Sequence, residues 1–268
     1  MSNGALALKR AGFGATARRD AWWIQPLVTF AVFSAFIVYS TWAGMQGEYY
    51  HFGPYLSPFY SPELFGESPH RWIDAVKPSW WPAWMLWSPA FFVVPFPIGF
   101  RLTCYYYRGA YYKAFWADPP NCAVGEPRTG YRGENSFPLI LQNLHRYFLI
   151  PALALIAILT YDAWAALWFK NATTGAYEFG IGVGSIVLAL NAFLLGGYTL
   201  GCHSLRHLVG GGLDRMSESP ARMISWRCVS CLNNRHMRWA WFSLVWVGFT
   251  DLYVRLCAMG IWTDWRII

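Results

Sequence analysis

Five long apolar segments constrain this chain more than any other feature of its sequence. A transmembrane helix needs about 20 predominantly apolar residues, and each of the five segments is at least that long. Their approximate bounds are 22–44, 81–107, 144–169, 179–208 and 239–262. Charged residues make up 13% of the 268 positions, about half the level of soluble proteins. We therefore expect an all-α integral membrane protein with five transmembrane helices in one bundle.

Basic residues gather on one side of these expected spans. Four precede the first span, five lie between Arg101 and Arg132, and six surround the connection between the fourth and fifth spans, against five on the other side. The positive-inside rule then places the N-terminus in the cytoplasm and the C-terminus outside. Residues 1–21 become a cytoplasmic N-terminal segment, and 22–268 a single domain in the plasma (inner) membrane. The asymmetry explains the net charge of +7 without a nucleic-acid partner.

Prolines and an ion-pair spacing add local expectations. Because proline removes a backbone donor and clashes with the preceding turn, we expect the outer half of the second span to be kinked or partly unwound. The loop 45–79 is rich in proline and aromatic residues, and an interfacial aromatic belt is favoured there over a lid above a substrate. In the fifth span, Asp251 and Arg255 have the i,i+4 spacing of a helical ion pair, which we prefer to a proton relay.

Side chains that can bind metals lie at the same face as the basic residues. Five of the six cysteines and four of the six histidines fall at the cytoplasmic ends of spans two to five or in their connections. They are Cys104, Cys122, Cys202, Cys228, Cys231, His145, His203, His207 and His236. Cysteines used only as small core residues would show no preference for one side. The pattern favours a metal or redox centre, and because cytosolic thiols stay reduced, it argues against disulfides.

Several centres fit two cysteines and two histidines. Tetrahedral zinc and a Rieske-type [2Fe–2S] cluster both use this set, and haem b needs paired axial histidines. Spans one and two contain no histidine, which excludes a two-haem arrangement but leaves open one haem between His145 and a histidine of span four. Cys228 and Cys231 have the most motif-like spacing, although a lone CxxC pair is weak evidence.

The segment Cys202-His203-Ser204-Leu205-Arg206-His207 ends the fourth span. On a continuous helix His203 and His207 would lie about 40° apart and share a face, whereas Cys202 would point about 100° away from His203. The segment therefore predicts one wall of a site between helices, with the other ligands coming from spans two and three and from the Cys122 loop.

Four blocks of sequence, taken together, carry a resemblance to a known family. They are Tyr106-Tyr107-Arg108 through Asp118-Pro119-Pro120-Asn121-Cys122-Ala123-Val124, then Phe137 to Tyr147, Cys202 to His207, and Leu232-Asn233-Asn234-Arg235-His236. Over roughly residues 15–262 the chain resembles the five-helix membrane anchor of a haem-free succinate dehydrogenase, similar to the mycobacterial enzyme whose anchor holds a membrane-embedded Rieske-type cluster.

The resemblance implies a multi-subunit respiratory complex. A flavoprotein subunit would oxidise succinate at covalent FAD, so no residue of this chain would be catalytic in that step. An iron–sulfur subunit with its own clusters would carry the electrons inward, and this chain would deliver them to a quinone, with menaquinone expected. Both partner subunits would dock on the cytoplasmic face, and a higher oligomer of the complex stays open.

The resemblance also assigns residues. Two ligands of the cluster would come from Cys104, Cys122 and Cys202 and two from His145, His203 and His207, with His236, Cys228 and Cys231 in reserve. Candidates for binding quinone are Arg146, Tyr147, Arg206 and Tyr112, because cations and hydrogen-bond donors stabilise the negative charge that reduction builds on the quinone oxygens. For each arginine, snorkelling to the interface or pairing with a partner subunit is an equal alternative.

Three other functions compete. A transporter would show an internal repeat and polar residues near the membrane midplane, and the sequence shows neither. A thiol–quinone oxidoreductase could use Cys228 and Cys231 as a redox pair, but the expected topology puts them on the wrong side for disulfide formation. A structural anchor with a zinc staple stays open.

Overall fold

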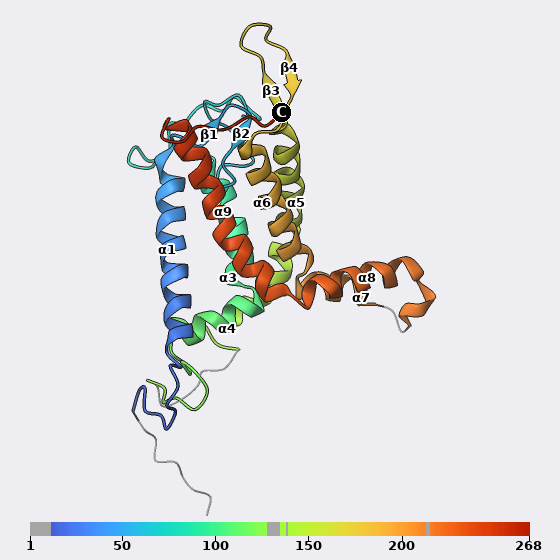
Figure 1. The fold of residues 1–268 in the computed structure, drawn as a ribbon. Helices are drawn as coiled ribbons and strands as arrows, with labels where there is room; N and C mark the ends of the chain where they lie inside the picture. The colour runs from blue at the N-terminus through green and yellow to red at the C-terminus, as the bar shows by residue number, and fades with distance from the viewer. Residues whose placement is uncertain (1–11, 128–134, 138, 213–214) are drawn as a thin grey trace, which may run out of the picture. The chain divides into compact units, whose positions relative to one another are not determined.

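The protein, represented by a computed structural model, is mostly helical (Figure 1). The structure describes residues 12–127, 135–137, 139–212 and 215–268. Four of the basic residues counted in the sequence therefore lie outside the described residues: Lys9, Arg10, Arg128 and Arg132. Three described helical stretches are long and apolar enough to cross a membrane: Ile24–Gln46, Leu139–Ala165 and Val183–Leu200. The helical membrane class is thus confirmed, whereas five spans, their orientation and a single bundle stay predictions.

The chain forms two compact units. The first combines residues 1–35 with 101–144 and contains the start of α1 (Ile24–Gln46), α4 (Tyr105–Ala114) and the 3-10 helix η1 (Leu139–Leu144). In this unit the ring of Phe33 on α1 packs 5.0 Å from the ring of Tyr107 on α4. These two rings hold α1 against α4 inside the first unit.

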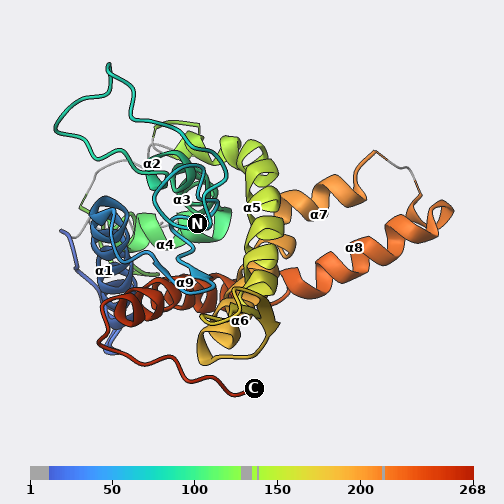
Figure 2. The same cartoon turned by 90° about the horizontal axis from the view of Figure 1, so that it is seen from above.

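The second unit combines residues 36–100 with 145–268 and holds most of the helices. In it α5, α6 and α9 run side by side, with α6 in contact with both of the others (Figures 1 and 2). The helices of this part of the chain are α2 (Ala90–Val93), α3 (Pro95–Leu102), α5 (His145–Ala165), α6 (Val183–Leu200), α7 (His203–Gly210), α8 (Pro220–Asn233) and α9 (His236–Ala258), with the 3-10 helix η2 (Met216–Glu218). Two antiparallel hairpins accompany them: β1 (His51–Phe52) with β2 (Tyr55–Leu56), and β3 (Trp168–Lys170) with β4 (Tyr177–Phe179).

A glycine sets the distance between α6 and α9. A Cβ atom on Gly197 would lie 2.6 Å from the indole ring of Trp239, closer than real contacts allow, so any larger residue would push the two helices apart. The Trp246 indole also donates a hydrogen bond to the Val187 carbonyl at 3.1 Å. Small residues at such contacts let membrane helices approach closely, and α6 and α9 use this device.

The second predicted span differs from one helix over 81–107. Residues 81–89 are not helical, and α2 begins only at Ala90, directly after its N-cap residue Pro89. This confirms the expected unwinding of the outer half. The continuous helix to residue 107 is wrong, because the chain breaks before Cys104, whose extended backbone starts α4 as its N-cap residue.

The fourth predicted span, 179–208, also breaks. Helix α6 ends at Leu200, and α7 starts after Cys202, which adopts an extended backbone conformation as the N-cap. A Cβ atom on Gly201 would lie 2.8 Å from the Gly197 carbonyl oxygen and 3.2 Å from Leu232, so a glycine is needed where the chain turns. The basic connection between the fourth and fifth predicted spans contains α8.

Residues 48–68 form an ordered cap at the end of the unit that bears the C-terminus. Carboxylates of the surrounding elements hold it: Ser57 donates to Asp251 of α9, and Ser61 donates to Asp162 of α5. Tyr55 donates to Asp264 at 2.7 Å, which ties the cap to the C-terminal segment. The cap is therefore fixed to the helices by hydrogen bonds rather than laid loosely over them.

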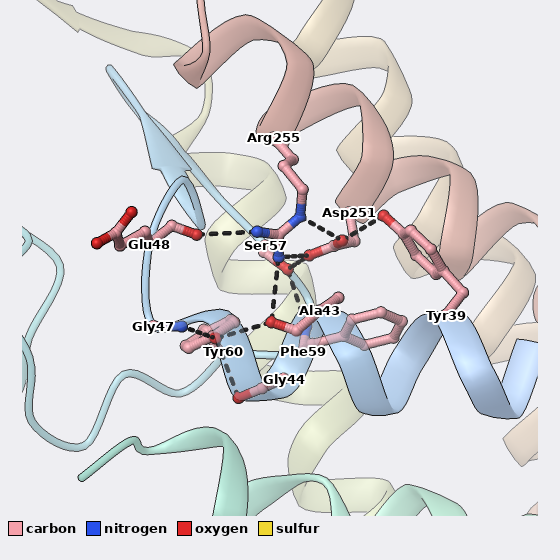
Figure 3. Close-up of polar contacts among 10 residues, drawn as sticks. All are labelled: Tyr39, Ala43, Gly44, Gly47, Glu48, Ser57, Phe59, Tyr60, Asp251 and Arg255. Carbon is pink, nitrogen blue, oxygen red and sulfur yellow. Dashed lines mark hydrogen bonds and ion pairs between the residues drawn. The ribbon is translucent and has the colours of Figure 1, made fainter. Parts of the chain in front are cut away.

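One buried ion pair lies at the centre of this end of the unit (Figure 3). Arg255 Nε lies 3.3 Å from Asp251 Oδ2, and both side chains are fully buried, which confirms the predicted pair. Tyr39 of α1 donates to the same carboxylate at 2.5 Å. The Arg255 guanidinium also donates to the Glu48 carbonyl at 2.9 Å and to the Ala43 carbonyl at 3.3 Å. The pair thus satisfies carbonyl groups at the end of α1, which have no partner within the helix.

Removal of the negative charge at Asp251 tests this network. We expect Asp251→Asn to cost about 3 kcal/mol or more of stability, because it leaves the Arg255 cation buried without a counter-charge. Asp74→Asn is the matched control: Asp74 is exposed and pairs with the exposed Arg71, so its loss should cost less than about 1 kcal/mol. Thermal unfolding of the purified protein, followed by tryptophan fluorescence, measures both. Equal shifts of the two unfolding midpoints would contradict the central role of the buried pair.

Candidate redox site

Two of the predicted ligands meet inside the second unit. His145 Nε2 lies 3.0 Å from Cys202 Sγ, a hydrogen-bond distance, and both side chains are buried. His145 is the first residue of α5, and Cys202 lies between α6 and α7. The pair forms because α5 begins, and α6 ends, at the same end of the unit (Figure 1).

Cys202 occupies a position that favours the thiolate. Its Sγ accepts a hydrogen bond from the Ser204 amide at 3.3 Å and so caps the N-terminus of α7. The positive end of a helix dipole stabilises a negative charge there. Because metal binding requires the thiolate, the backbone prepares Cys202 as a ligand.

His203 and His207 share one face of α7, as predicted, with ring centroids 6.3 Å apart. Partial desolvation, followed by the neighbouring His207 and Arg206, lowers the pKa of His203, so its imidazole is neutral and able to bind a metal at neutral pH. The predicted angle of Cys202 on the same helix is wrong, because Cys202 caps α7 instead of belonging to it.

Cys104 and Cys122 belong to the first unit. Cys104 is buried and, like Cys202, is the N-cap residue of a helix, here α4, with an extended backbone, but its side chain makes no capping hydrogen bond. Cys122 is exposed, and its backbone amide donates a hydrogen bond to the Asn121 side chain at 2.8 Å. Of these two cysteines, Cys104 has the backbone setting of a ligand.

The reserve ligands lie in different surroundings. Cys228 and Cys231 are exposed on α8. His236 is buried at the start of α9, where its ring stacks on Tyr198 at 5.0 Å. Among the described residues no group of three or more His, Cys, Asp and Glu side chains lies close enough to hold a metal ion. The structure thus brings together one thiol and one imidazole of the predicted set, with two further imidazoles on the adjoining helix.

A row of aromatic rings connects the two buried histidines. The His145 ring stacks on Phe100 at 4.4 Å, Phe100 meets Tyr198 edge-on at 5.6 Å, and Tyr198 stacks on His236. These rings come from four helices and fill the space between His145 and His236. The sequence analysis missed Phe100 and Tyr198, because neither belongs to a motif. Only their position near the polar end of an apolar segment could have drawn attention to them.

The predicted quinone-binding residues take three different settings. Arg146 and Tyr147 follow His145 in the first turn of α5 and are exposed, Tyr147 by 65%. Arg206 donates to Ser230 at 3.0 Å and stacks on Trp226, which holds it within the second unit. Tyr112, in the first unit, is half-buried on α4.

Known proteins match this sequence and fold closely. The sequence profile described as actinobacterial succinate dehydrogenase subunit SdhC matches residues 24–260. A chain of the Mycobacterium smegmatis Sdh1 complex, solved in the apo form, is 40% identical, with a TM-score of 0.83 and with all of both chains covered. No curated protein matches the sequence.

The burial of the thiols predicts their reactivity. In the purified protein, N-ethylmaleimide should modify Cys228 and Cys231 well before Cys202, because a reagent must reach the sulfur and Cys202 is 1% exposed. Cys257, near the C-terminal end of α9, is buried to a similar extent. It should react with N-ethylmaleimide as slowly as Cys202 and serves as the control. Peptide mass spectrometry after timed quenching gives the order. Modification of Cys202 as fast as that of Cys231 would show that the His145–Cys202 pair is open to solvent.

Proposed function

Since the chain belongs to the actinobacterial succinate dehydrogenase subunit SdhC family and is the membrane-anchor subunit of a succinate dehydrogenase, we propose that it reduces a quinone with electrons from the iron–sulfur subunit. A Rieske-type [2Fe–2S] cluster would carry them. The buried pair of His145 and Cys202 is the observation that supports this assignment most, because it joins the two donor types of such a cluster away from water.

The donor set fits the cluster in type. A Rieske-type cluster takes two thiolates on one iron and two imidazoles on the other. In the second unit, Cys202 offers a capped thiolate, and His145 and His203 offer imidazoles, with His207 as the alternative. The second thiolate is expected from Cys104 or Cys122, as the sequence predicts. When bound, the cluster would supply one-electron transfer, and the protein supplies the ligands and a dry setting.

Haem b is the alternative that the sequence leaves open. A haem held by His145 and a histidine of span four is disfavoured by packing, because the His145 ring stacks on Phe100 at 4.4 Å and its Nε2 atom lies 3.0 Å from Cys202 Sγ. A zinc staple would use the same donors as the cluster and differs from it only in the metal. Metal and sulfide content therefore separates these two.

The residues after His145 support quinone binding from the lipid. Successive positions on a helix point about 100° apart, so His145 faces the interior of the unit while Arg146 and Tyr147 are exposed. A quinone that diffuses within the bilayer would meet these two side chains first. The Arg146 guanidinium and the Tyr147 hydroxyl would hold its oxygens and stabilise the negative charge of the reduced form. Arg206 and Tyr112 stay further candidates for the same role.

The membrane topology of the proposal has five spans. Besides the three apolar helices, α9 has 23 residues, about 35 Å at 1.5 Å per residue, which is long enough to cross. Two of its charged residues, Asp251 and Arg255, are paired and buried, so they do not face lipid, and the third, Arg238, lies in its first turn. Helices α2 and α3, with the irregular residues before them, would form the remaining span. The excess of basic residues puts the N-terminus in the cytoplasm of a multi-pass plasma-membrane protein.

A cysteine variant tests the cluster. Cys202→Ser should abolish the electron paramagnetic resonance signal of a reduced Rieske-type centre and lower quinone reduction at least tenfold, because serine is a poor ligand for iron in such a cluster. Succinate oxidation with a soluble dye, which reports on the flavoprotein subunit, should be unchanged. Cys257→Ser, which also alters a buried cysteine of the second unit, is the matched control and should keep the signal.

Chemical analysis of the purified complex completes this test. Iron and labile sulfide in excess of the partner subunits' clusters, both lost in Cys202→Ser, would agree with the proposal. Zinc without additional sulfide would contradict it, and a haem spectrum would favour the haem alternative.

A tyrosine variant tests the quinone site. Tyr147→Phe should raise the KM for quinone about fivefold, since a lost hydrogen bond costs about 1 kcal/mol. Tyr161→Phe is the control, because Tyr161 lies near the other end of α5 and is equally exposed, by 65%. Steady-state quinone reduction by the complex measures both variants. An unchanged KM in Tyr147→Phe, or an equal rise in Tyr161→Phe, would remove Tyr147 from the site.

A further inference from the structure

Helices α7 and α8 form a hairpin that projects sideways from α5, α6 and α9. Figures 1 and 2 show it at the end of the second unit where α6 ends and α9 begins, running across the direction of those helices. Arg222 of α8 donates to the Val209 carbonyl at 3.1 Å and also to the Gly211 carbonyl, which caps the end of α7. Arg206 links α7 back to Ser230 of α8 at 3.0 Å. Hydrogen bonds from these two arginines therefore hold α7 and α8 together as one hairpin.

Other arginines of this region point outward. Arg227, Arg235 and Arg238 are exposed, and within the part of the chain that the structure describes none of them forms an ion pair. They follow the chain from α8 into the first turn of α9. We call these three residues the arginine surface. It carries three positive charges, and no carboxylate of the described residues pairs with them.

Large apolar side chains are exposed beside the arginine surface. Ile224 precedes Arg227 by three residues, so the two share a face of α8, and Ile224 is 60% exposed. Met237, next to Arg238, is 56% exposed, and Leu208 on α7 is 68% exposed. Unbalanced cations next to exposed apolar side chains are typical of helices that lie in the membrane interface.

The direction of the hairpin supports the same placement. Helices α5 and α6 include two of the segments that can cross the membrane, so a hairpin that leaves their ends sideways runs along the membrane surface. Its length extends past α5, α6 and α9 (Figures 1 and 2). A basic side chain near an anionic membrane surface gains about 1 kcal/mol.

We propose that the α7–α8 hairpin lies in the membrane interface and that the arginine surface binds the headgroups of anionic phospholipids. The phosphodiester groups would accept hydrogen bonds from Arg227, Arg235 and Arg238, while Ile224 and Met237 contact the upper part of the acyl chains. The proposal rests on the membrane-anchor assignment and on charge complementarity. It does not depend on the cluster or on the quinone site.

Lipid titration of the purified complex tests the proposal. Native mass spectrometry would follow the binding of dioleoyl phosphatidylglycerol, with dioleoyl phosphatidylcholine as the neutral probe. In the triple variant Arg227→Gln, Arg235→Gln and Arg238→Gln, the apparent affinity for phosphatidylglycerol should fall at least tenfold, and that for phosphatidylcholine should not change. The control variant removes the same charge at the other end of the chain's helices, through Arg71→Gln, Lys77→Gln and Lys170→Gln, and should bind both lipids as the parent does.

Two results would overturn the proposal. One is unchanged phosphatidylglycerol binding in the triple variant with the complex intact. The other is dissociation of the remaining subunits with phosphatidylglycerol binding retained, which would assign the arginine surface to a partner protein. Dye-linked succinate oxidation and the electron paramagnetic resonance signal are measured on the same samples. They distinguish a failure of the lipid-binding proposal from a failure of the cluster assignment.

Discussion

Hydrogen bonding of helix ends is the constraint on which this structure depends. Within a bilayer no water is present to satisfy free backbone groups, so each turn of the chain needs a partner for the amides or carbonyls it exposes. Arg255 and Tyr60 supply it at the end of α1, where both donate to the Ala43 carbonyl. Cys202 supplies it at the start of α7, where its sulfur accepts the Ser204 amide. The Cys202 sulfur is also the proposed ligand of the electron-transfer centre, so the same atom would cap the helix and bind the cluster.

The sequence predicts those parts of the fold that depend on hydrophobicity alone. Helices α1, α5 and α6 follow from apolar length, and the Asp251–Arg255 pair follows from helical spacing. Hydropathy fails at Cys104 and Cys202, since both continue an apolar run and their capping role depends on backbone angles that composition does not reveal. It also fails for α8, whose stability comes from contacts of Arg206 and Arg222 with neighbouring elements.

In the candidate site, the sequence indicates which residue types gather, whereas the packing of the helices determines which side chains make contact. The sequence predicts a gathering of thiols and imidazoles, and the structure places two of these side chains, His145 and Cys202, at hydrogen-bond distance. The CxxC spacing of Cys228 and Cys231 looks more like a ligand motif, yet both thiols are exposed on α8. The contact of Phe100 with His145 was not predicted, because a ring stacked on a buried histidine is determined by how four helices meet.

The network around Asp251 and Arg255 has a consequence for biogenesis. Its partners precede it in the chain by a long interval: Ser57 lies 194 residues before Asp251, and Ala43 lies 212 residues before Arg255. In the proposed five-span topology α9 is the last helix to be inserted, and its two charges would meet lipid if those partners were not already in position. Insertion of α9 would therefore depend on prior docking of the cap and of α1. Stable insertion of α9 would then require that the partners of the ion pair are already in place, so that misassembled chains would fail to keep α9 in the membrane.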